Sequence, residues 1–320
     1  MRVAVLDDYQ QVASGYADWS GLDVMFFAGL GAGLGAGLGA GLGAGLGAGP
    51  GADLTPFDVI VAMRERTPFP AEVLDRLPNL RLLVTTGMKN AAIDLAAAQR
   101  NGIVVCGTRS GPPGAVVELT WGLILGLSRH LVAEDQQIRA GGWQHTVGLS
   151  LSGRRLGVIG LGRLGTPVAA VGAAFGMDVV TWSRSLEKAG EITKDELLAT
   201  SDVVTLHVPL TPASRGLIGR ADLARMKPSA LLINTSRGPL VDEAALLEAL
   251  YAGTIGGAGL DVFDIEPLPA DSPWRSAPRT LLAPHLGYVT GATYEVFFTD
   301  AVEDIRAFAA GHPIRTLASS

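Results

Sequence analysis

The sequence predicts an α/β protein with two domains, each built around a parallel sheet. Short apolar segments rich in Val, Ile and Leu alternate with helix-compatible segments along most of the chain, which is typical of parallel strands joined by helical crossovers. The 320 residues are enough for about two domains with separate cores. In the second half, one apolar segment leads directly into a turn with three closely spaced glycines.

The first half of the chain contains several expected strands and one long interruption. We expect strands at residues 2–6, 22–27, 57–62, 80–85 and 103–107, and helices at residues 70–77 and 91–100. Between the second and third strands, Ala-Gly-Leu-Gly repeats five times over residues 28–47, and the segment closes at residue 52. Alternate glycines weaken both helix and strand. We interpret residues 28–52 as a low-complexity linker rather than a phosphate cradle, because they contain no basic residue and no strand–helix frame surrounds them.

The second half resumes the alternation after a break rich in proline and glycine at residues 111–114. A long helix is expected over residues 116–140, followed by an apolar strand that ends at Ile159. Further strands are expected at residues 179–183, 203–208, 230–234, 259–263 and 280–283, with helices at 194–199, 221–226 and 243–253. The last helix, residues 290–311, has no strand after it and is expected to return to the first domain.

The strand that ends at Ile159 leads into Gly160, Gly162 and Gly165, which form the pattern Gly-x-Gly-x-x-Gly. In that pattern the first glycine permits a tight turn, the second lets a pyrophosphate approach the backbone, and the third lets helix and strand pack closely. The helix that follows offers N–H groups and a positive dipole end to the phosphates. With a strand before it and a helix after it, the motif predicts a Rossmann-like dinucleotide site rather than a purely structural turn.

Composition excludes several classes of protein. Lys and Arg number 25 against 31 Asp and Glu, a net charge of −6, so neither nucleic acid nor an anionic membrane is an expected partner. The start turns acidic at Asp7, too early for a signal peptide, and the apolar stretch over residues 119–132 is interrupted at residues 128–130. The single cysteine, Cys106, excludes an internal disulfide framework and a cysteine-based zinc site. We therefore expect a cytoplasmic protein without a metal.

The choice of dinucleotide depends on the end of the second strand of this domain. An Asp or Glu is expected there in an NAD-binding protein, because a carboxylate bonds the ribose 2′-hydroxyl and repels a 2′-phosphate. This chain has Ser183 and Arg184 instead. Arginine can pair with a phosphate through its charge and its planar guanidinium. The pair therefore favours NADPH slightly over NADH, although Arg184 also fits a solvated loop position.

Three charged or titratable residues follow apolar strands of the second domain, where open α/β sheets bind their ligands. They are Arg237, Glu266 and His285. Such a set suits the reduction of a 2-oxo acid, because the arginine can polarise the anionic carbonyl compound and the histidine can donate a proton to oxygen while the cofactor delivers hydride to carbon. A carboxylate beside the histidine would fix its orientation. Taken singly, each also fits a plain role as a cap, a loop acid or a strand-end histidine. His207 fits the wall of the cofactor pocket better than the role of acid.

These passages, with the fingerprint and the segment that begins at His207, resemble the D-isomer-specific 2-hydroxyacid dehydrogenase family. The resemblance runs from Phe57 to near the C-terminus, and the order Arg, Glu, His with these flanking residues is specific to the family. It implies that Arg237, Glu266 and His285 form the catalytic set.

The resemblance also implies an architecture. A substrate domain would be built from residues 1–103 and 288–320, split by an inserted NAD(P)-binding domain at residues 104–287. The active site would lie in the cleft between them, and homodimers would form through the long helix and its neighbours.

Binding residues follow from the same resemblance. The loop with Thr86, Gly87 and Met88 would offer backbone N–H groups to the substrate carboxylate, although a plain strand-to-helix turn fits these residues too. Arg64 fits either the same cleft or a surface position. Asp261 would contact the nicotinamide amide. The remaining expected cofactor contacts are Gly160, Gly162, Arg163, Leu164, Gly165, Ser183, Arg184, His207, Val208, Pro209, Thr235, Ser236 and Gly287.

Other functions share this scaffold. Oxidation of formate or phosphite is one, although the formate enzymes carry glutamine where this chain has Glu266. Transcriptional corepressors that sense the cofactor keep the Arg-Glu-His set, but no basic or disordered tail suited to recruiting a partner is expected here. A third alternative is an inactive relative damaged by the repeat at residues 28–52. The identity of the 2-oxo acid depends on loops of the first domain in three dimensions.

Overall fold

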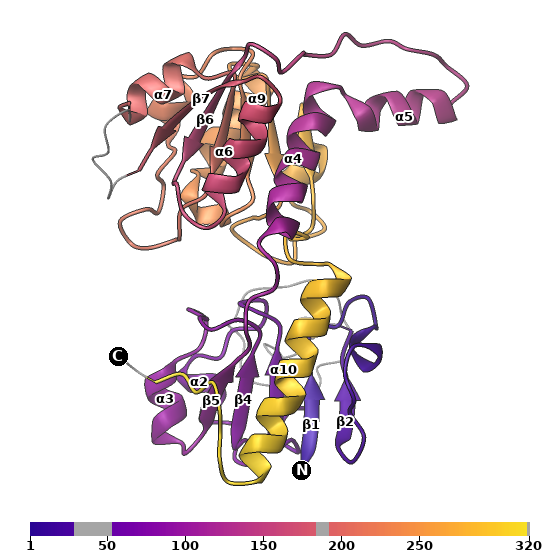
Figure 1. Cartoon of the computed structure of the whole chain (residues 1–320), viewed down its shortest axis with the longest axis vertical. Helices are drawn as coiled ribbons and strands as arrows, with labels where there is room; N and C mark the ends of the chain where they lie inside the picture. Colours follow the sequence, from indigo (N-terminus) through magenta and orange to yellow (C-terminus); the bar gives the residue numbers. More distant parts are fainter. Residues whose placement is uncertain (29–52, 184–191, 319–320) are drawn as a thin grey trace. The chain divides into compact units, whose positions relative to one another are not determined.

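The computed structural model of the chain describes residues 1–28, 53–183 and 192–318. These residues form two compact units, which we describe separately (Figure 1). Unit 1 comprises Met1–Pro112, Glu266–Pro269 and Val289–Ser320, and unit 2 comprises Pro113–Ile265 and Ala270–Tyr288. Residues 29–52 of the glycine-rich repeat and Arg184 lie outside the described residues, so the predictions made for them remain predictions.

Unit 1 contains a five-stranded parallel sheet with the order β2-β1-β3-β4-β5. Its strands are β1 (Arg2–Val5), β2 (Asp23–Phe26), β3 (Val59–Ala62), β4 (Leu82–Thr85) and β5 (Val104–Gly107). Every residue of β3 and β4 is buried. Such strands carry continuous apolar residues instead of an alternating pattern, because both faces of a parallel sheet are covered.

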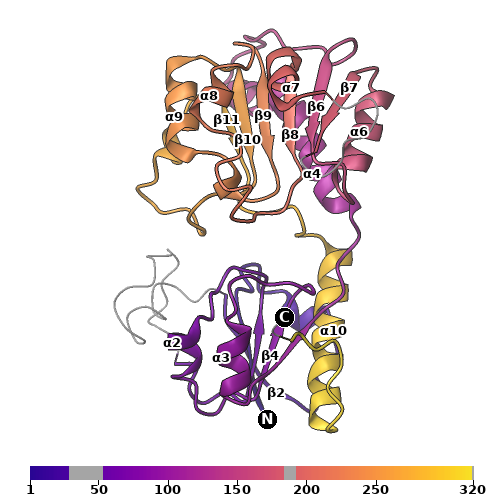
Figure 2. The same cartoon turned by 90° about the vertical axis from the view of Figure 1, so that its left-hand side faces the viewer.

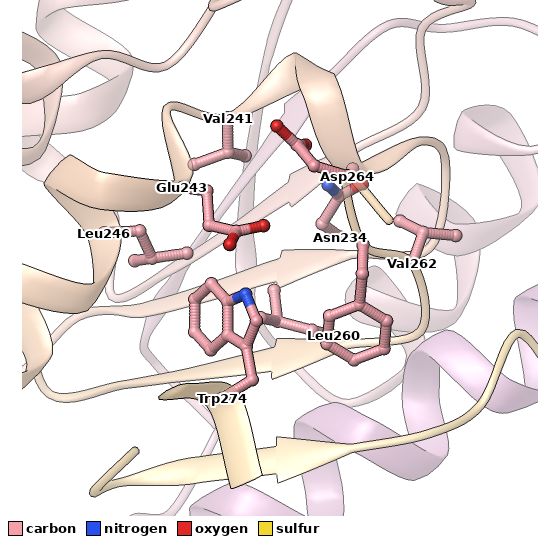
Figure 3. Close-up of a pocket in the computed structure, with 10 residues that line it drawn as sticks. Asn234, Val241, Glu243, Leu246, Leu260, Val262, Asp264 and Trp274 are labelled. Atoms are coloured by element: carbon pink, nitrogen blue, oxygen red, sulfur yellow. The ribbon is translucent and has the colours of Figure 1, made fainter. Parts of the chain in front are cut away.

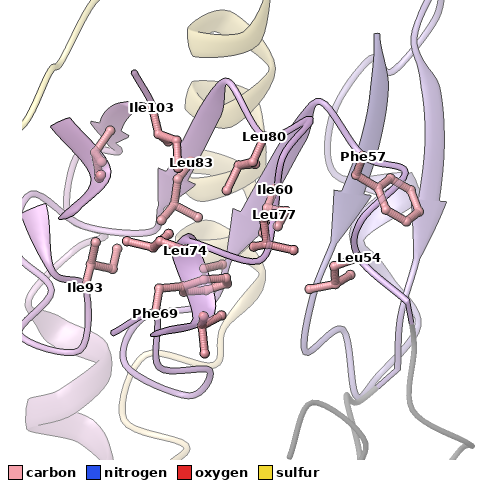
Figure 4. Packing of buried hydrophobic residues seen from close by; sticks show 14 of the residues in the cluster. Leu54, Phe57, Ile60, Phe69, Leu74, Leu77, Leu80, Leu83, Ile93 and Ile103 are labelled. Carbon is pink, nitrogen blue, oxygen red and sulfur yellow. The ribbon is translucent and has the colours of Figure 1, made fainter. Parts of the chain in front are cut away.

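The helices of unit 1 pack against this sheet. They are α2 (Ala71–Leu74), α3 (Leu95–Arg100) and α10 (Gly291–Ala309), together with the 3₁₀ turn η1 (Ala13–Gly15). Figure 4 shows side chains from β3, β4 and α2 meeting in a hydrophobic core, among them Ile60, Leu74 and Leu83. The last helix, α10, packs against β4 and buries Phe297 and Phe298.

The end of unit 1 differs from the predicted domain boundary at residue 103. β5, which the prediction gave to the cofactor domain, pairs with β4 in the unit 1 sheet. The C-terminal segment adds to this edge, because the N–H of Leu317 donates to the carbonyl of Val105 at 2.8 Å. Both edges of β5 are therefore hydrogen-bonded to segments of unit 1, to β4 on one side and to the C-terminal segment on the other.

Unit 2 contains a six-stranded parallel sheet with the order β11-β10-β9-β8-β6-β7, which Figure 2 shows edge to edge. Its strands are β6 (Arg155–Ile159), β7 (Asp178–Trp182), β8 (Val203–Leu206), β9 (Leu231–Asn234), β10 (Gly257–Leu260) and β11 (Thr280–Leu282). Neighbouring strands pair in parallel throughout. Both sheets thus confirm the predicted fold class of two parallel α/β units.

Helices cover the second sheet as the alternating sequence requires. α4 (Gly114–Ser128) contacts β9, β10 and β11, and α6 (Gly165–Ala174) contacts β6 and β7. α7 (Lys194–Thr200) also contacts β6 and β7, and α8 (Arg220–Leu223) packs against both α7 and α9 (Glu243–Ala252). In Figure 1, α6 and α7 lie on opposite sides of the strands.

The single helix predicted over residues 116–140 is wrong. The structure has two helices, α4 and α5 (Leu131–Arg139), with an angle of 62° between them. His130 adopts a left-handed conformation with φ of 51°, and the carbonyl of Ser128 accepts a hydrogen bond from the N–H of Leu149 at 2.7 Å. These two features end the first helix, because a left-handed residue cannot continue a right-handed helix. Among the described residues no single helix is long and apolar enough to cross a membrane, and only this bent pair reaches that length.

Candidate active site

The carboxyl ends of β6 and β8 form a topological switch point in unit 2. From β6 the chain passes through α6 to β7 on one side, whereas β8 pairs with β6 on the other side. The loops after two such strands diverge and leave a crevice, which is where open α/β sheets bind ligands. The glycine turn after β6 lies at this point.

The three fingerprint glycines occupy three different environments. Gly160 has φ of 98°, and a Cβ there would lie 2.6 Å from the carbonyl oxygen of His207. A Cβ on Gly165 would overlap the carbonyl oxygen of Gly160, whereas a Cβ on Gly162 would meet no atom within 4 Å. The first and third positions therefore allow close packing of turn, strand and helix, and the second leaves open space at the N-terminus of α6. This cradle fits the pyrophosphate of a dinucleotide.

His207 follows β8 and is only 9% exposed. Its Nε2 atom lies 2.9 Å from the hydroxyl of Thr205, and burial lowers its pKa to about 4. The ring is therefore neutral near pH 7. A neutral buried imidazole is suited to the wall of a pocket and not to the donation of a proton, in line with the role predicted for it. The adjacent Val208 contributes to the same wall, because its Cγ1 would meet a Cβ on Gly160 at 2.7 Å.

The loop that carries Arg237 is fixed by Asn234, the last residue of β9. The Asn234 Oδ1 accepts a hydrogen bond from the N–H of Ser236 at 3.1 Å, and its Nδ2 donates to the carbonyl of Arg237 at 2.9 Å. The Ser236 hydroxyl donates to the carbonyl of Leu206 at 2.6 Å. Thr235 is buried, and its hydroxyl lies 2.9 Å from that of Thr120. The role of Asn234 was not predicted, although an amide at a strand end just before the arginine is a turn-forming signal.

The loop that carries His285 is held by Asp261. This residue follows β10, is fully buried, and accepts hydrogen bonds from the N–H groups of Leu286 at 2.6 Å and Gly287 at 2.9 Å. The N–H of His285 donates to the carbonyl of Asp261 at 2.9 Å. His285 has φ of 54°, and its ring lies 5.3 Å from that of Tyr288 between centroids. Asp261, predicted as a contact of the nicotinamide, thus fixes the histidine loop with both carboxylate oxygens.

Glu266 belongs to unit 1 and lies near its first loop. Burial of Tyr9 raises the pKa of its hydroxyl to about 12, together with the negative charge of Asp7 and a smaller contribution from Glu266. His285 belongs to unit 2. The predicted pairing of Glu266 with His285 remains a prediction.

The predicted carboxylate-binding loop follows β4 in unit 1. Thr86 is fully buried, and its N–H donates to the carbonyl of Ala62 at 3.0 Å. Gly87 has φ of 91°, and its N–H donates to the hydroxyl of Thr108 at 2.8 Å. Two of the three N–H groups expected to receive the substrate, those of Thr86 and Gly87, therefore already have acceptors, whereas Met88, at 41% exposed, lies at the surface.

Arg64 lies against this loop. Its guanidinium would overlap a Cβ placed on Gly87, so only a glycine lets it approach so closely. The N–H of Arg64 donates to the hydroxyl of Thr86 at 2.9 Å, and Asn90 donates to the carbonyl of Arg64 at 2.7 Å. The structure thus brings Arg64 together with this loop, and the cleft-facing role predicted for Arg64 stays a prediction.

A small cavity lies behind the Arg237 loop, with Asn234 and Gly238 in its wall (Figure 3). The indole nitrogen of Trp274 points toward the carboxylate of Glu243, and no group within the described parts of the chain forms a hydrogen bond with this nitrogen. Burial, followed by the charge of Glu243, raises the pKa of Asp264 at the same cavity. The sequence analysis did not single out these residues.

Comparison with known proteins defines the class of this chain. A family model described as "D-isomer specific 2-hydroxyacid dehydrogenase, NAD binding domain" matches residues 121–287. This segment includes the glycine turn and the loops of Arg237 and His285. The chain belongs to the D-isomer-specific 2-hydroxyacid dehydrogenase family, and it is an oxidoreductase that uses a nicotinamide dinucleotide.

Individual relatives match over most of their length. A glycerate dehydrogenase of Methylorubrum extorquens is 37% identical over 264 residues, which cover 79% of this chain and 83% of that protein. A glyoxylate reductase of Aeropyrum pernix is 38% identical over 258 residues, covering 75% of this chain and 76% of that protein. The crystal structure of a phosphoglycerate oxidoreductase from Vibrio cholerae superposes with a TM-score of 0.87 at 37% identity, covering 97% of this chain and 99% of that one.

Proposed function

We propose that this dehydrogenase interconverts a small 2-oxo acid and its D-2-hydroxy acid, with Arg237, Glu266 and His285 as the catalytic set. The observation that supports this most strongly is that the Asp261 carboxylate accepts two backbone hydrogen bonds from the loop that carries His285. These hydrogen bonds fix His285 beside the carboxyl ends of β10 and β11, at the same edge of the sheet as the glycine turn. An acid fixed beside a dinucleotide site is the arrangement that coupled hydride and proton transfer needs.

Each catalytic residue has a defined task in this proposal. Arg237 binds the anionic substrate and polarises its carbonyl, and His285 donates a proton to the carbonyl oxygen during reduction. Glu266 orients the imidazole. A bound nicotinamide dinucleotide supplies the hydride, and the glycine turn with the N-terminus of α6 would hold its pyrophosphate. Thr235, Ser236, His207 and Pro209 line the cofactor side in this proposal.

The substrate carboxylate is assigned to the loop after β4. The N–H groups of Thr86 and Gly87 already donate to Ala62 and Thr108. In this proposal the substrate carboxylate is therefore bound mainly by the Arg64 guanidinium and by the exposed part of the loop at Met88. A guanidinium can bind a carboxylate through two parallel hydrogen bonds, which fixes both position and orientation.

We assign a slight preference for NADPH over NADH. β7 ends at Trp182, and half-buried Ser183 stands where an NAD-binding protein carries an acid. The absence of a carboxylate in the sequence at residues 183–185 removes the repulsion of a 2′-phosphate. Turnover with the two cofactors at equal concentration tests this assignment, and a strong preference for NADH would contradict it.

We further propose a cytoplasmic homodimer that forms through α5 and the segment after it. No residue of α5 is buried, and Ile138, Trp143 and Val147 are 56%, 72% and 94% exposed. Figure 1 shows α5 and the following segment extending away from the sheet of unit 2. Apolar side chains exposed in this way are typical of a surface covered by a partner. Trp143→Asp should convert a dimer into a monomer in analytical ultracentrifugation, and a monomeric parent protein would contradict the proposal.

The decisive assay measures oxidation of NADPH and NADH with glyoxylate, hydroxypyruvate, pyruvate and bulkier 2-oxo acids. The proposal predicts turnover with at least one of them. Cofactor binding without turnover of any acid would instead favour a cofactor-sensing or inactive relative.

A further inference from the structure

The hydroxyl of Thr108 connects the end of β5 to the loop after β4. Thr108 is fully buried, and its Oγ1 accepts a hydrogen bond from the N–H of Gly87 at 2.8 Å and donates to the carbonyl of Arg109 at 3.0 Å. The two segments are in close contact, because a Cβ on Gly107 would lie 2.6 Å from the carbonyl oxygen of Gly87. One hydroxyl therefore satisfies a donor and an acceptor in two adjacent segments.

The acceptor side of this link is anchored to α10. The N–H of Arg109 donates to Asp300 Oδ2 at 2.7 Å, and its guanidinium donates to Asp300 Oδ1 at 2.6 Å. The Asp300 side chain is completely buried. Burial alone would raise the pKa of Asp300, but the hydrogen bonds from Arg109 hold it below its ordinary value. Asp300 is thus a fixed anion, and the backbone at Arg109 has a fixed position.

Two threonine hydroxyls fix two neighbouring residues in left-handed conformations. Gly87 has φ of 91° and bonds Thr108, and Arg64 has φ of 53° and bonds the hydroxyl of Thr86. A left-handed conformation is strained for a residue such as arginine, so it persists only where the surroundings stabilise it. The guanidinium of Arg64 lies against Gly87, so the position of Gly87 determines the space available to that guanidinium.

We propose that Thr108 is a positioning residue for substrate binding, because its hydroxyl holds Gly87 where Arg64 and the exposed part of the loop can receive the substrate carboxylate. This inference rests on the proposed function of that loop. Thr108 does not touch the reacting atoms. It acts through Gly87, and the chain from Asp300 through Arg109 keeps it in place.

The test compares Thr108→Val, which removes the hydroxyl and keeps the shape, with Thr108→Ser, which keeps the hydroxyl. In Thr108→Val we expect the KM for the 2-oxo acid to rise about tenfold, with kcat changed by less than about threefold, since one buried hydrogen bond is lost. The Kd for NADPH should stay unchanged. Thr108→Ser should restore a KM within about twofold of the parent value.

Thr67→Val is the matched control, because Thr67 is also buried in unit 1 but donates its hydroxyl to Asp7 at 2.7 Å. Its thermal stability should fall about as much, without the rise in KM. Hydrogen exchange of a peptide covering residues 82–90 gives a readout that needs no activity, and it should accelerate in Thr108→Val and not in Thr67→Val.

Several outcomes would overturn the proposal. One is an unchanged KM and unchanged exchange in Thr108→Val. Another is a lower KM, which would mean that the released N–H of Gly87 itself binds the carboxylate. A third is a Thr108→Ser variant as impaired as Thr108→Val, which would assign the effect to the methyl group. Inactivity of the parent protein with every acid would instead refute the proposed function, and the exchange measurement would still decide whether Thr108 holds the loop.

Discussion

Asp261→Asn should damage catalysis more than it damages the fold. In the parent protein the buried carboxylate accepts two N–H groups of the histidine loop, at 2.6 Å from Leu286 and 2.9 Å from Gly287. An asparagine keeps one acceptor and turns an NH₂ group toward the other N–H. Hydrogen bonds to charged groups contribute about 1.5–3 kcal/mol each, so the loss is about 2–3 kcal/mol for the ordered loop. Because about 1.4 kcal/mol corresponds to a factor of ten, kcat should fall about 30-fold to about 140-fold.

Asp202→Asn provides the control for this change. Asp202 is also buried in unit 2 and accepts the N–H of Arg155 at 2.8 Å and the Lys227 ammonium at 3.1 Å, but it precedes β8 at the opposite edge of the sheet. Both variants should show a lower midpoint of thermal unfolding, whereas only Asp261→Asn should lose kcat. If kcat of Asp261→Asn stayed within twofold of the parent value, the role assigned to Asp261 would be refuted.

Further predictions concern the cofactor turn and the C-terminal segment. Gly165→Ala should lower both the midpoint of thermal unfolding and the affinity for NADPH, because its Cβ overlaps the Gly160 carbonyl, whereas Gly162→Ala should lower only the affinity. Thermal unfolding measures the midpoint and fluorescence titration measures the affinity. Equal unfolding midpoints for the two variants would contradict this prediction. Burial raises the pKa of Asp304 to about 7. The folded state therefore retains a proton that the unfolded chain releases near pH 4, so the free energy of unfolding falls as pH rises from about 4 to about 7. Asp304→Asn should remove this component, so its unfolding midpoint should fall less between pH 5 and pH 8 than that of the parent; identical pH dependence would show that Asp304 does not titrate in this range.

The parts of the fold that were predicted correctly depend on local signals. Continuous apolar residues predict buried parallel strands. The Gly-x-Gly-x-x-Gly motif that begins at Gly160 predicts the turn after β6, because each glycine is required by the local backbone geometry or by close packing. The break at His130 was missed, because it depends on a tertiary hydrogen bond from Leu149 to the carbonyl of Ser128 as well as on the left-handed residue itself.

In the candidate site, too, local features were predicted from the sequence, whereas features that depend on tertiary contacts were not. The sequence singled out Arg237 and His285 through their positions after strands, but it did not indicate what holds them. Thr108 lies 21 residues from Gly87, and Asp261 lies 26 residues from Gly287. Contacts at such separations depend on which strands become neighbours in the sheet, and no local pattern encodes that pairing. For this reason the supporting hydrogen bonds became visible only in the structure.

The most direct test of the central claim is the turnover of His285→Ala with a 2-oxo acid that the parent protein reduces. We predict a loss of about 10²–10⁴-fold in kcat, which is the usual contribution of a positioned general acid, with NADPH binding retained in a fluorescence titration. Turnover within tenfold of the parent protein would contradict the assignment of His285 as the proton donor.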